Sequence, residues 1–100
     1  MITNKVEIHG DVAFIYITRA GVEHIAIVNA SDLRFIDKHA KVKLTLDSGG
    51  YVQHKQKVNG KWEVFQLHRL LAGAFTWERV SFLNGNKLDL RISNLKCECP

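Results

Sequence analysis

The sequence predicts a single α+β domain, and three observations lead to that prediction. The chain has 100 residues, of which 46% are hydrophobic, and this is enough to close around one core. Apolar and polar residues alternate along most of the chain, as they do in strands, and short segments with helical spacing interrupt the alternation. Turn-forming pairs divide these runs into a β-meander with a short helix over residues 1–40, a three-stranded sheet with a helix over 41–75, and a hairpin with a helix over 78–96.

Residues 5–30 alternate strongly and predict an antiparallel β-meander. Gly10-Asp11 and Ala20-Gly21 supply turn residues between the three runs. The middle run, residues 12–18, is apolar on both faces, so we expect it to be the central strand.

A short helix is predicted at residues 32–39, directly after the meander. Ser31 precedes it as a residue type that is preferred at helix N-caps. Leu33, Phe35 and Ile36 are expected to form the buried side of this helix.

The second part of the chain is expected to form a three-stranded antiparallel sheet. Asn59-Gly60 predicts a tight hairpin, because both positions tolerate the positive φ of a type I′ turn. The predicted elements are strands over 41–46, 51–58 and 61–66, a turn over 47–50 and a helix over 67–75.

Positive charge is concentrated in this second part. Residues 38–61 contain six lysines and two histidines against one acidic residue, Asp47, and the whole chain has a net charge of +4. A basic surface attracts phosphate backbones through counterion release. Two interpretations remain open: a solvated outer face of the sheet, or a sheet that offers its polar face to nucleic acid.

The chain is expected to be a soluble, cytoplasmic protein without a membrane partner. Its apolar runs fall short of the roughly 20 residues that a membrane helix needs, and its charged start is unlike a signal peptide. Cys97 and Cys99 are too close in sequence to bridge without strain, which fits a reducing compartment. Free thiols and a zinc site are the two alternatives at this pair, although zinc normally takes four ligands.

The third part predicts a strand at 78–83, a turn at 84–86 and a helix that Asp89 caps and that ends near Lys96. Three apolar residues with helical spacing are expected in the core: Leu88, Ile92 and Leu95.

Several motifs make the chain resemble the HNH endonuclease family, in particular its phage and bacterial homing-type branch. In the C-terminal third they are Leu67-His68-Arg69-Leu70-Leu71, Asn84-Gly85-Asn86-Lys87-Leu88-Asp89, Arg91 and Ser93-Asn94-Leu95-Lys96. Residues 5–11, 32–33, 50–52 and 60–61 are similar to the family as well, so the resemblance covers nearly the whole chain.

The resemblance implies a ββα-metal fold, in which a histidine base and a divalent cation cleave DNA. At the family's aspartate, histidine and middle asparagine positions this chain has Ser81, Phe82 and Leu90, and only Asn94 remains at the later metal position. Serine is a poor ligand for a hard cation, phenylalanine transfers no proton and leucine forms no hydrogen bond. We therefore expect a protein that is not an enzyme and that binds no metal and no cofactor.

His68 is the histidine that remains in the helix of the motif. One interpretation is that it packs against the hairpin and donates one hydrogen bond. The other is that it serves as a substitute base, which would leave a residual metal-dependent DNA endonuclease as a minor hypothesis.

The first functional hypothesis is a pseudo-nuclease of phage or mobile-element origin that binds double-stranded DNA. The predicted three-stranded sheet with its helix is also similar to the DNA-reading sheet of plant ethylene-response factors, a unit that accompanies homing-type HNH proteins. Five lysines are expected to contact phosphates: Lys41, Lys43, Lys55, Lys57 and Lys61. His54 or Gln53 is expected nearer the base edges, and Arg69 is a further candidate for a phosphate contact.

The second hypothesis is a protein-binding inhibitor or regulator of a host nuclease or defence complex, of the anti-CRISPR kind. Exposed Phe82 and Leu90 would favour it, because they would form an apolar patch where catalytic groups face DNA in the family. Burial of both residues would favour DNA binding instead. The oligomeric state is left open, and a dimer formed through exposed strand edges is one option.

Overall fold

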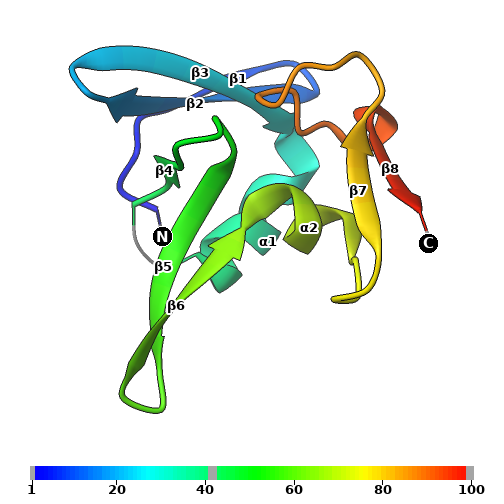
Figure 1. Cartoon of the computed structure of the whole chain (residues 1–100). Helices are drawn as coiled ribbons and strands as arrows, with labels where there is room; N and C mark the ends of the chain where they lie inside the picture. The colour runs from blue at the N-terminus through cyan, green and yellow to red at the C-terminus, as the bar shows by residue number, and fades with distance from the viewer. Residues whose placement is uncertain (1, 41–42, 99–100) are drawn as a thin grey trace.

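The α+β class is confirmed by the computed structural model, which describes residues 2–40 and 43–98. The strands pair antiparallel in three sheets, with the orders β1-β2-β3, β4-β5-β6 and β7-β8 (Figure 1). The strands are β1 (Val6–His9), β2 (Val12–Arg19), β3 (Val22–Asn29), β4 (Thr45–Leu46), β5 (Val52–Val58), β6 (Lys61–Gln66), β7 (Arg79–Phe82) and β8 (Leu95–Glu98). The helical segments are η1 (Ala30–Asp32), α1 (Leu33–His39), α2 (Leu67–Ala72) and η2 (Ile92–Asn94). Within the described ranges, no helix is long and apolar enough to cross a membrane.

The predicted β-meander is confirmed, and β2 is its central strand. Alternate residues of β2 point into the protein, so Ala13, Ile15 and Ile17 are completely buried. Ile15 lies opposite Val6 of β1 and Ala26 of β3, which places one apolar face across the sheet. This face forms one wall of the core.

The core lies between this sheet and the elements that follow it in the chain. Ile36 of α1, Val52 of β5, Leu67 of α2 and Leu90 are all completely buried in the same hydrophobic cluster. Asn4 joins the first two sheets, because its side-chain amide donates to the carbonyls of Tyr16 and Leu44 at 3.0 Å each. The two sheets are thus fixed relative to one another through apolar packing and this shared amide.

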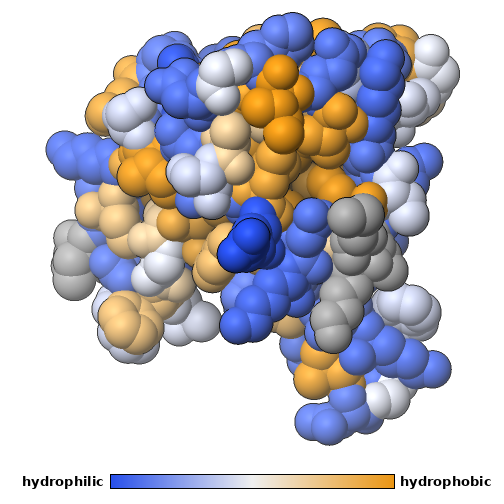
Figure 2. Space-filling view, turned by 180° about the vertical axis from the view of Figure 1, so that it is seen from behind, coloured by the Kyte–Doolittle hydropathy of each residue, from blue (hydrophilic) through white to orange (hydrophobic). Residues whose placement is uncertain are grey.

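The β5–β6 hairpin extends beyond the body of the protein, and we call it the arm (Figure 1). Asn59 and Gly60 have φ values of 50° and 80°, which confirms the predicted two-residue turn with positive φ at both positions. The surface of the arm is mostly hydrophilic (Figure 2). The predicted strand over 41–46 is shorter than expected: β4 begins only at Thr45, and residues 41–42 lie outside the described part of the chain.

Two of the three predicted helices form, with different ends. Ser31 is not an N-cap residue but lies inside the 3₁₀ turn η1, which precedes α1 and whose N-cap is Asn29. Phe35 is 39% exposed, since Ile36 and Ala40, four residues apart, are the positions that face the core. The second helix ends at Ala72 rather than near residue 75, because Gly73 adopts the left-handed conformation, φ 65°, that terminates helices.

The helix predicted at residues 89–96 is wrong. The segment forms the short turn η2 and then β8, which pairs with β7 from Arg79↔Glu98 to Phe82↔Leu95. Before it, the backbone lies extended beside β3: the Ile27 amide donates to Leu88 and the Leu90 amide donates to Ile27, at 2.7 Å each. Both pairings require extended backbone, so the expected ββα unit has no C-terminal helix, and Ile92 is 47% exposed rather than buried.

Candidate nucleic-acid interface

The positions at which the HNH resemblance places catalytic residues are mainly structural in this chain. Leu90 is completely buried in the core, and Phe82 is partly buried against it. The Phe82 ring packs on His68, with ring centroids 5.2 Å apart, and lies 6.2 Å from the Tyr51 ring. Neither apolar residue therefore forms the exposed patch that would have favoured the protein-binding hypothesis.

Asn94 belongs to a hydrogen-bonded network and not to an open ligand site. Its side-chain Nδ2 donates to the backbone carbonyl of Asp89 and to Asn84 Oδ1 at 2.9 Å each. Its Oδ1 accepts from the backbone amide of Asn84 at 3.0 Å. Asn84 Nδ2 donates in turn to Asp89 Oδ2 at 2.9 Å. The Asn-Gly-Asn turn and the later asparagine, which are the most specific part of the resemblance, therefore act together to close the hairpin.

Asp89 and Arg91 complete this network, and neither was expected to have a role of this kind. The Arg91 guanidinium donates to both carboxylate oxygens, at 2.8 and 2.7 Å, while Asp89 itself is 98% buried, with 2% of its surface exposed. These bonds from Arg91 hold the pKa of Asp89 below its ordinary value, against the opposing effect of burial. Asp89 thus anchors the chain as a buried, paired carboxylate, where a helix cap was predicted.

His68 is buried in a cluster of three rings. It is 5% exposed, stacks on Tyr51 at 5.1 Å and packs against Phe82. Burial, followed by the charge of Arg69, lowers its pKa to about 4. The expected packing against the hairpin is present, because the ring contacts Phe82 of β7. The expected hydrogen bond is not seen at Nδ1, which is buried and has no partner among the described residues.

Among the described residues, no group of three or more histidine, cysteine, aspartate or glutamate side chains could hold a metal ion. Cys97 is exposed, and its Sγ donates to Glu78 Oε2 at 3.1 Å. Cys99 lies outside the described ranges, so the choice between free thiols and a zinc site at this pair is not tested.

The predicted DNA-contacting residues separate into two groups because strand residues alternate between faces. Lys43, Lys55 and Lys57 are exposed and lie on the outer face of the β4–β5–β6 sheet, which we call the lysine face. Lys61 is exposed beside the turn of the arm, and Lys41 lies outside the described residues. The four described lysines of the predicted set are therefore all exposed, on this sheet or beside its turn.

His54 and Arg69 occupy other places than predicted. His54 points inward from β5, is 2% exposed and stacks on Phe65 at 5.3 Å, so it cannot reach base edges from the lysine face. The Arg69 guanidinium donates to the carbonyls of Glu78 and Phe75 at 2.8 and 2.6 Å. It therefore holds the loop between α2 and β7, and its terminal nitrogens are engaged there.

The lysine face consists of three cross-strand rows defined by strand register. The first row is Thr45, Gln53 and Gln66, the second contains Lys55 and Val64, and the third contains Lys57 and Trp62. Lys43 joins Lys55 in lining a groove of about 470 Å³ together with Thr45, Gln53 and Trp62. Of the side chains described on this face, none is acidic.

Trp62 is the residue that sequence reasoning missed. It is 70% exposed on the lysine face, directly opposite Lys57. The Asn59-Gly60 turn fixes the register of the hairpin, so counting outward from that turn would have paired Trp62 with Lys57. An exposed tryptophan between lysines offers a flat apolar surface to sugars or bases beside charges for phosphates.

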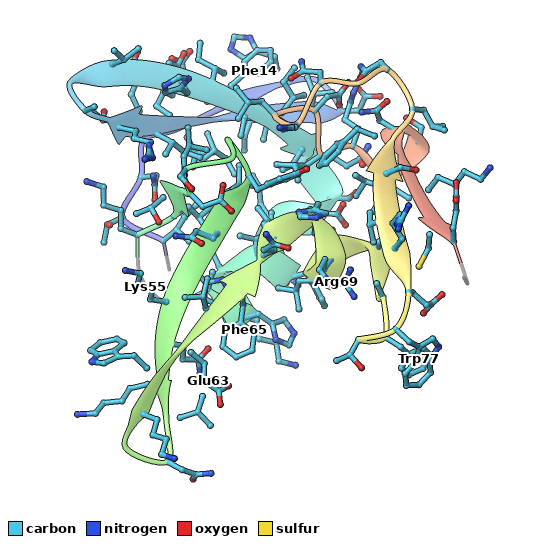
Figure 3. All side chains as sticks on the ribbon, in the orientation of Figure 1. Phe14, Lys55, Glu63, Phe65, Arg69 and Trp77 are labelled. Carbon is cyan, nitrogen blue, oxygen red and sulfur yellow. The ribbon has the colours of Figure 1, made fainter. Side chains whose placement is uncertain are left out.

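Of the two acidic residues near the lysine face, Glu63 is directed away from it and Asp47 lies at its edge, beside Gln66. Glu63 lies opposite Gln56 on the other face, and Lys55 and Glu63 point to opposite sides of the arm in Figure 3. Asp47 stands beyond the first row, where its Oδ1 accepts from the amides of Gly49 and Tyr51 at 2.9 Å each. The positive charges of the lysine face therefore have no acidic partners within the face.

No family model, no curated protein and no solved structure matches the chain.

Proposed function

We propose that this protein is a pseudo-HNH protein of phage or mobile-element origin that binds double-stranded DNA through its lysine face and does not cleave it. The observation that carries the proposal is the gathering of Lys43, Lys55, Lys57 and Trp62 on one face without an acidic side chain. Lysines so arranged gain affinity for DNA by releasing counterions from phosphates. On this proposal the protein works in the cytoplasm of a bacterial host.

The burial of the former catalytic positions also supports binding over catalysis. Leu90 contributes to the core and Asn94 to a closed hydrogen-bonded network, so both side chains are already used by the fold. The projecting arm offers its face to a large partner without interference from the body (Figure 1). A sheet of this kind can enter the major groove of a duplex.

The test is a titration of random and A·T-rich duplexes at several salt concentrations. Each phosphate contact contributes about −0.9 to the slope of log K against log salt concentration. We expect Lys43→Gln/Lys55→Gln/Lys57→Gln to make the slope shallower by about 3 and to weaken binding to all duplexes. Lys5→Gln/Lys38→Gln/Lys96→Gln is the matched control, because it removes the same charge from exposed positions on other elements. Absence of binding at low salt, or an equal loss in the control, would contradict the proposal.

A protein-binding inhibitor is a second candidate, and one observation favours it. Phe75 and Trp77 are 61% and 62% exposed and stack in parallel, with centroids 4.8 Å apart, on the loop that Arg69 holds. Exposed aromatic residues are typical of protein interfaces. Capture of a host protein after nuclease treatment, lost in Trp77→Ala and kept in the lysine triple variant, would support this candidate.

A further inference from the structure

The first row of the lysine face differs from the other two rows, because it carries amides and a hydroxyl instead of charges. Gln53 is its central member, with Thr45 on one side and Gln66 on the other. Successive outward residues on a strand are about 7 Å apart, so the three rows span about 13 Å. The major groove is about 12 Å wide, so the span of the three rows is close to the width of one groove.

Asp47 indicates how a duplex would be oriented on this face. Its carboxylate lies beyond the first row, where Gln66 Nε2 approaches its Oδ2 at 3.5 Å. A carboxylate repels phosphates, whereas Lys43, Lys55 and Lys57 attract them. The phosphate backbone is therefore favoured over the second and third rows, and the first row is left to face base edges.

Within the first row, Gln53 has the side chain that is free to read a base. It forms no hydrogen bond with any other described residue, whereas the Gln66 amide is directed to Asp47. Gln53 also lines the groove on the lysine face, between Thr45 and Lys55. His54, its neighbour in sequence, is excluded because it is buried on the opposite face.

We propose that Gln53 reads an adenine in the major groove, with its amide NH₂ donating to N7 and its carbonyl accepting from the N6 amino group. This pairing is the one that an unpaired glutamine amide makes with a base edge through two hydrogen bonds. The inference rests on the proposed DNA-binding function and adds the base that the site prefers. It assigns positioning to the lysines and base choice to one residue.

The experiment is selection from a randomised duplex library by the full chain, followed by affinity measurements on the selected sites. The wild-type protein is expected to select one position occupied by A·T, and changing that pair to G·C is expected to weaken binding between about 5-fold and 150-fold. Gln53→Ala should lose this preference and keep its affinity for random duplex. Gln56→Ala is the matched control, since it removes the same amide from the other face of the arm, and it should keep the preference.

Two further measurements identify the atoms involved. Replacing the selected adenine by 7-deazaadenine removes the N7 acceptor, and it should weaken the wild type while leaving Gln53→Ala unaffected. Gln53→Arg should move the preference at the same position to G·C, because arginine pairs with guanine N7 and O6. The unfolding midpoint of each variant shows whether it retains the fold.

The possible failures are distinct. If the wild type binds duplexes with a steep salt dependence but selects no A·T position, or if Gln53→Ala keeps the selected position, the inference about Gln53 is wrong and DNA binding stands. If the wild type binds no duplex at low salt, the proposed function fails, and the inference fails with it.

Discussion

At the scale of single residues, His68 shows how an apparent catalytic group can belong to the packing. Its ring packs against those of Tyr51 and Phe82, and its Nδ1 is buried without a hydrogen-bond partner among the described residues. A charged imidazole at this position would be poorly solvated, so folding favours the neutral form. A group held neutral in this way suits a hydrophobic contact between α2 and β7 better than proton transfer near neutral pH.

This burial predicts a loss of stability in mild acid. The pKa of His68 falls from 6.5 to about 4 on folding, so between these values the unfolded chain binds more protons, and stability decreases as pH falls through this window. From pH 7.5 to pH 5.0 we expect the free energy of unfolding to fall by about 2 kcal/mol through this residue. Urea denaturation at the two pH values measures the change.

His68→Gln is the variant that tests the assignment, and its stability should depend less on pH over that interval. His9→Gln is the matched control for the loss of an imidazole, because His9 is exposed on β1 and lies outside the ring cluster of His68. Equal pH dependence in the wild type and His68→Gln would show that other groups are responsible.

The sequence predicted the exposure of some side chains correctly and the position of others wrongly. The lysines of the sheet were predicted at exposed positions, because strand alternation separates them from Val52 and its apolar neighbours. His54 and Arg69 were misplaced for different reasons. His54 has the parity of the buried face of β5, and the partners of Arg69 are backbone carbonyls six and nine residues away, whose positions depend on tertiary structure.

At the scale of elements, the C-terminal hairpin depends on the network of Asn84, Asp89, Arg91 and Asn94. Asp89 and Asn94 are buried, and hydrogen bonds with Asn84 and Arg91 pair their polar groups. The network supports the path of the chain between β7 and β8, which is one long connection of extended backbone and turns. These residue types are therefore needed at these positions for their hydrogen bonds, although the segment is not a helix.

We expect Asn94→Ala to lower the free energy of unfolding by about 2 kcal/mol, because it leaves the Asn84 amide and the Asp89 carbonyl without these partners. Ser93→Ala changes the adjacent exposed residue and should alter stability by less than about 0.5 kcal/mol. Chemical denaturation of both variants gives the comparison. Hydrogen exchange in β7 and β8 should be faster in Asn94→Ala, and equal exchange rates in the two variants would contradict this role.

The elements with local signals were predictable, and the element fixed by distant contacts was not. Gly10-Asp11, Ala20-Gly21 and Asn59-Gly60 lie between strands that pair directly, so turn residues and alternation are enough to define them. The segment after Asn86 has apolar residues at helical spacing, yet it is held extended by Ile27, about 60 residues earlier in the chain. Local spacing carries no information about such a partner.

At the scale of the whole molecule, most of the proposed binding face lies on the arm (Figure 1), whereas Phe82 and Leu90, at positions where the resemblance places catalytic residues, pack in or against the core. Binding and packing therefore use separate residues. This separation predicts that DNA binding survives the absence of a nuclease centre.

We expect no nicking of supercoiled plasmid by the wild type with Mg²⁺ or Mn²⁺, even at protein concentrations that saturate the DNA. Ser81→Asp/Phe82→His should remain inactive as well, since Leu90 and the engaged Asn94 supply no further ligand. Gel analysis of the plasmid forms measures both. Metal-dependent nicking that disappears in His68→Ala would instead establish the residual endonuclease.

If the protein descends from an HNH nuclease, as proposed, the burial of Leu90 affects whether cleavage could evolve again. Because this side chain is completely buried, returning to asparagine would place an amide in the hydrophobic cluster and destabilise the fold before any activity returned. Asp and His at positions 81 and 82 would bring no advantage without that third change. The route back to catalysis thus passes through genotypes that are both inactive and unstable, so filling the core at this position makes the loss of cleavage hard to reverse by stepwise mutation.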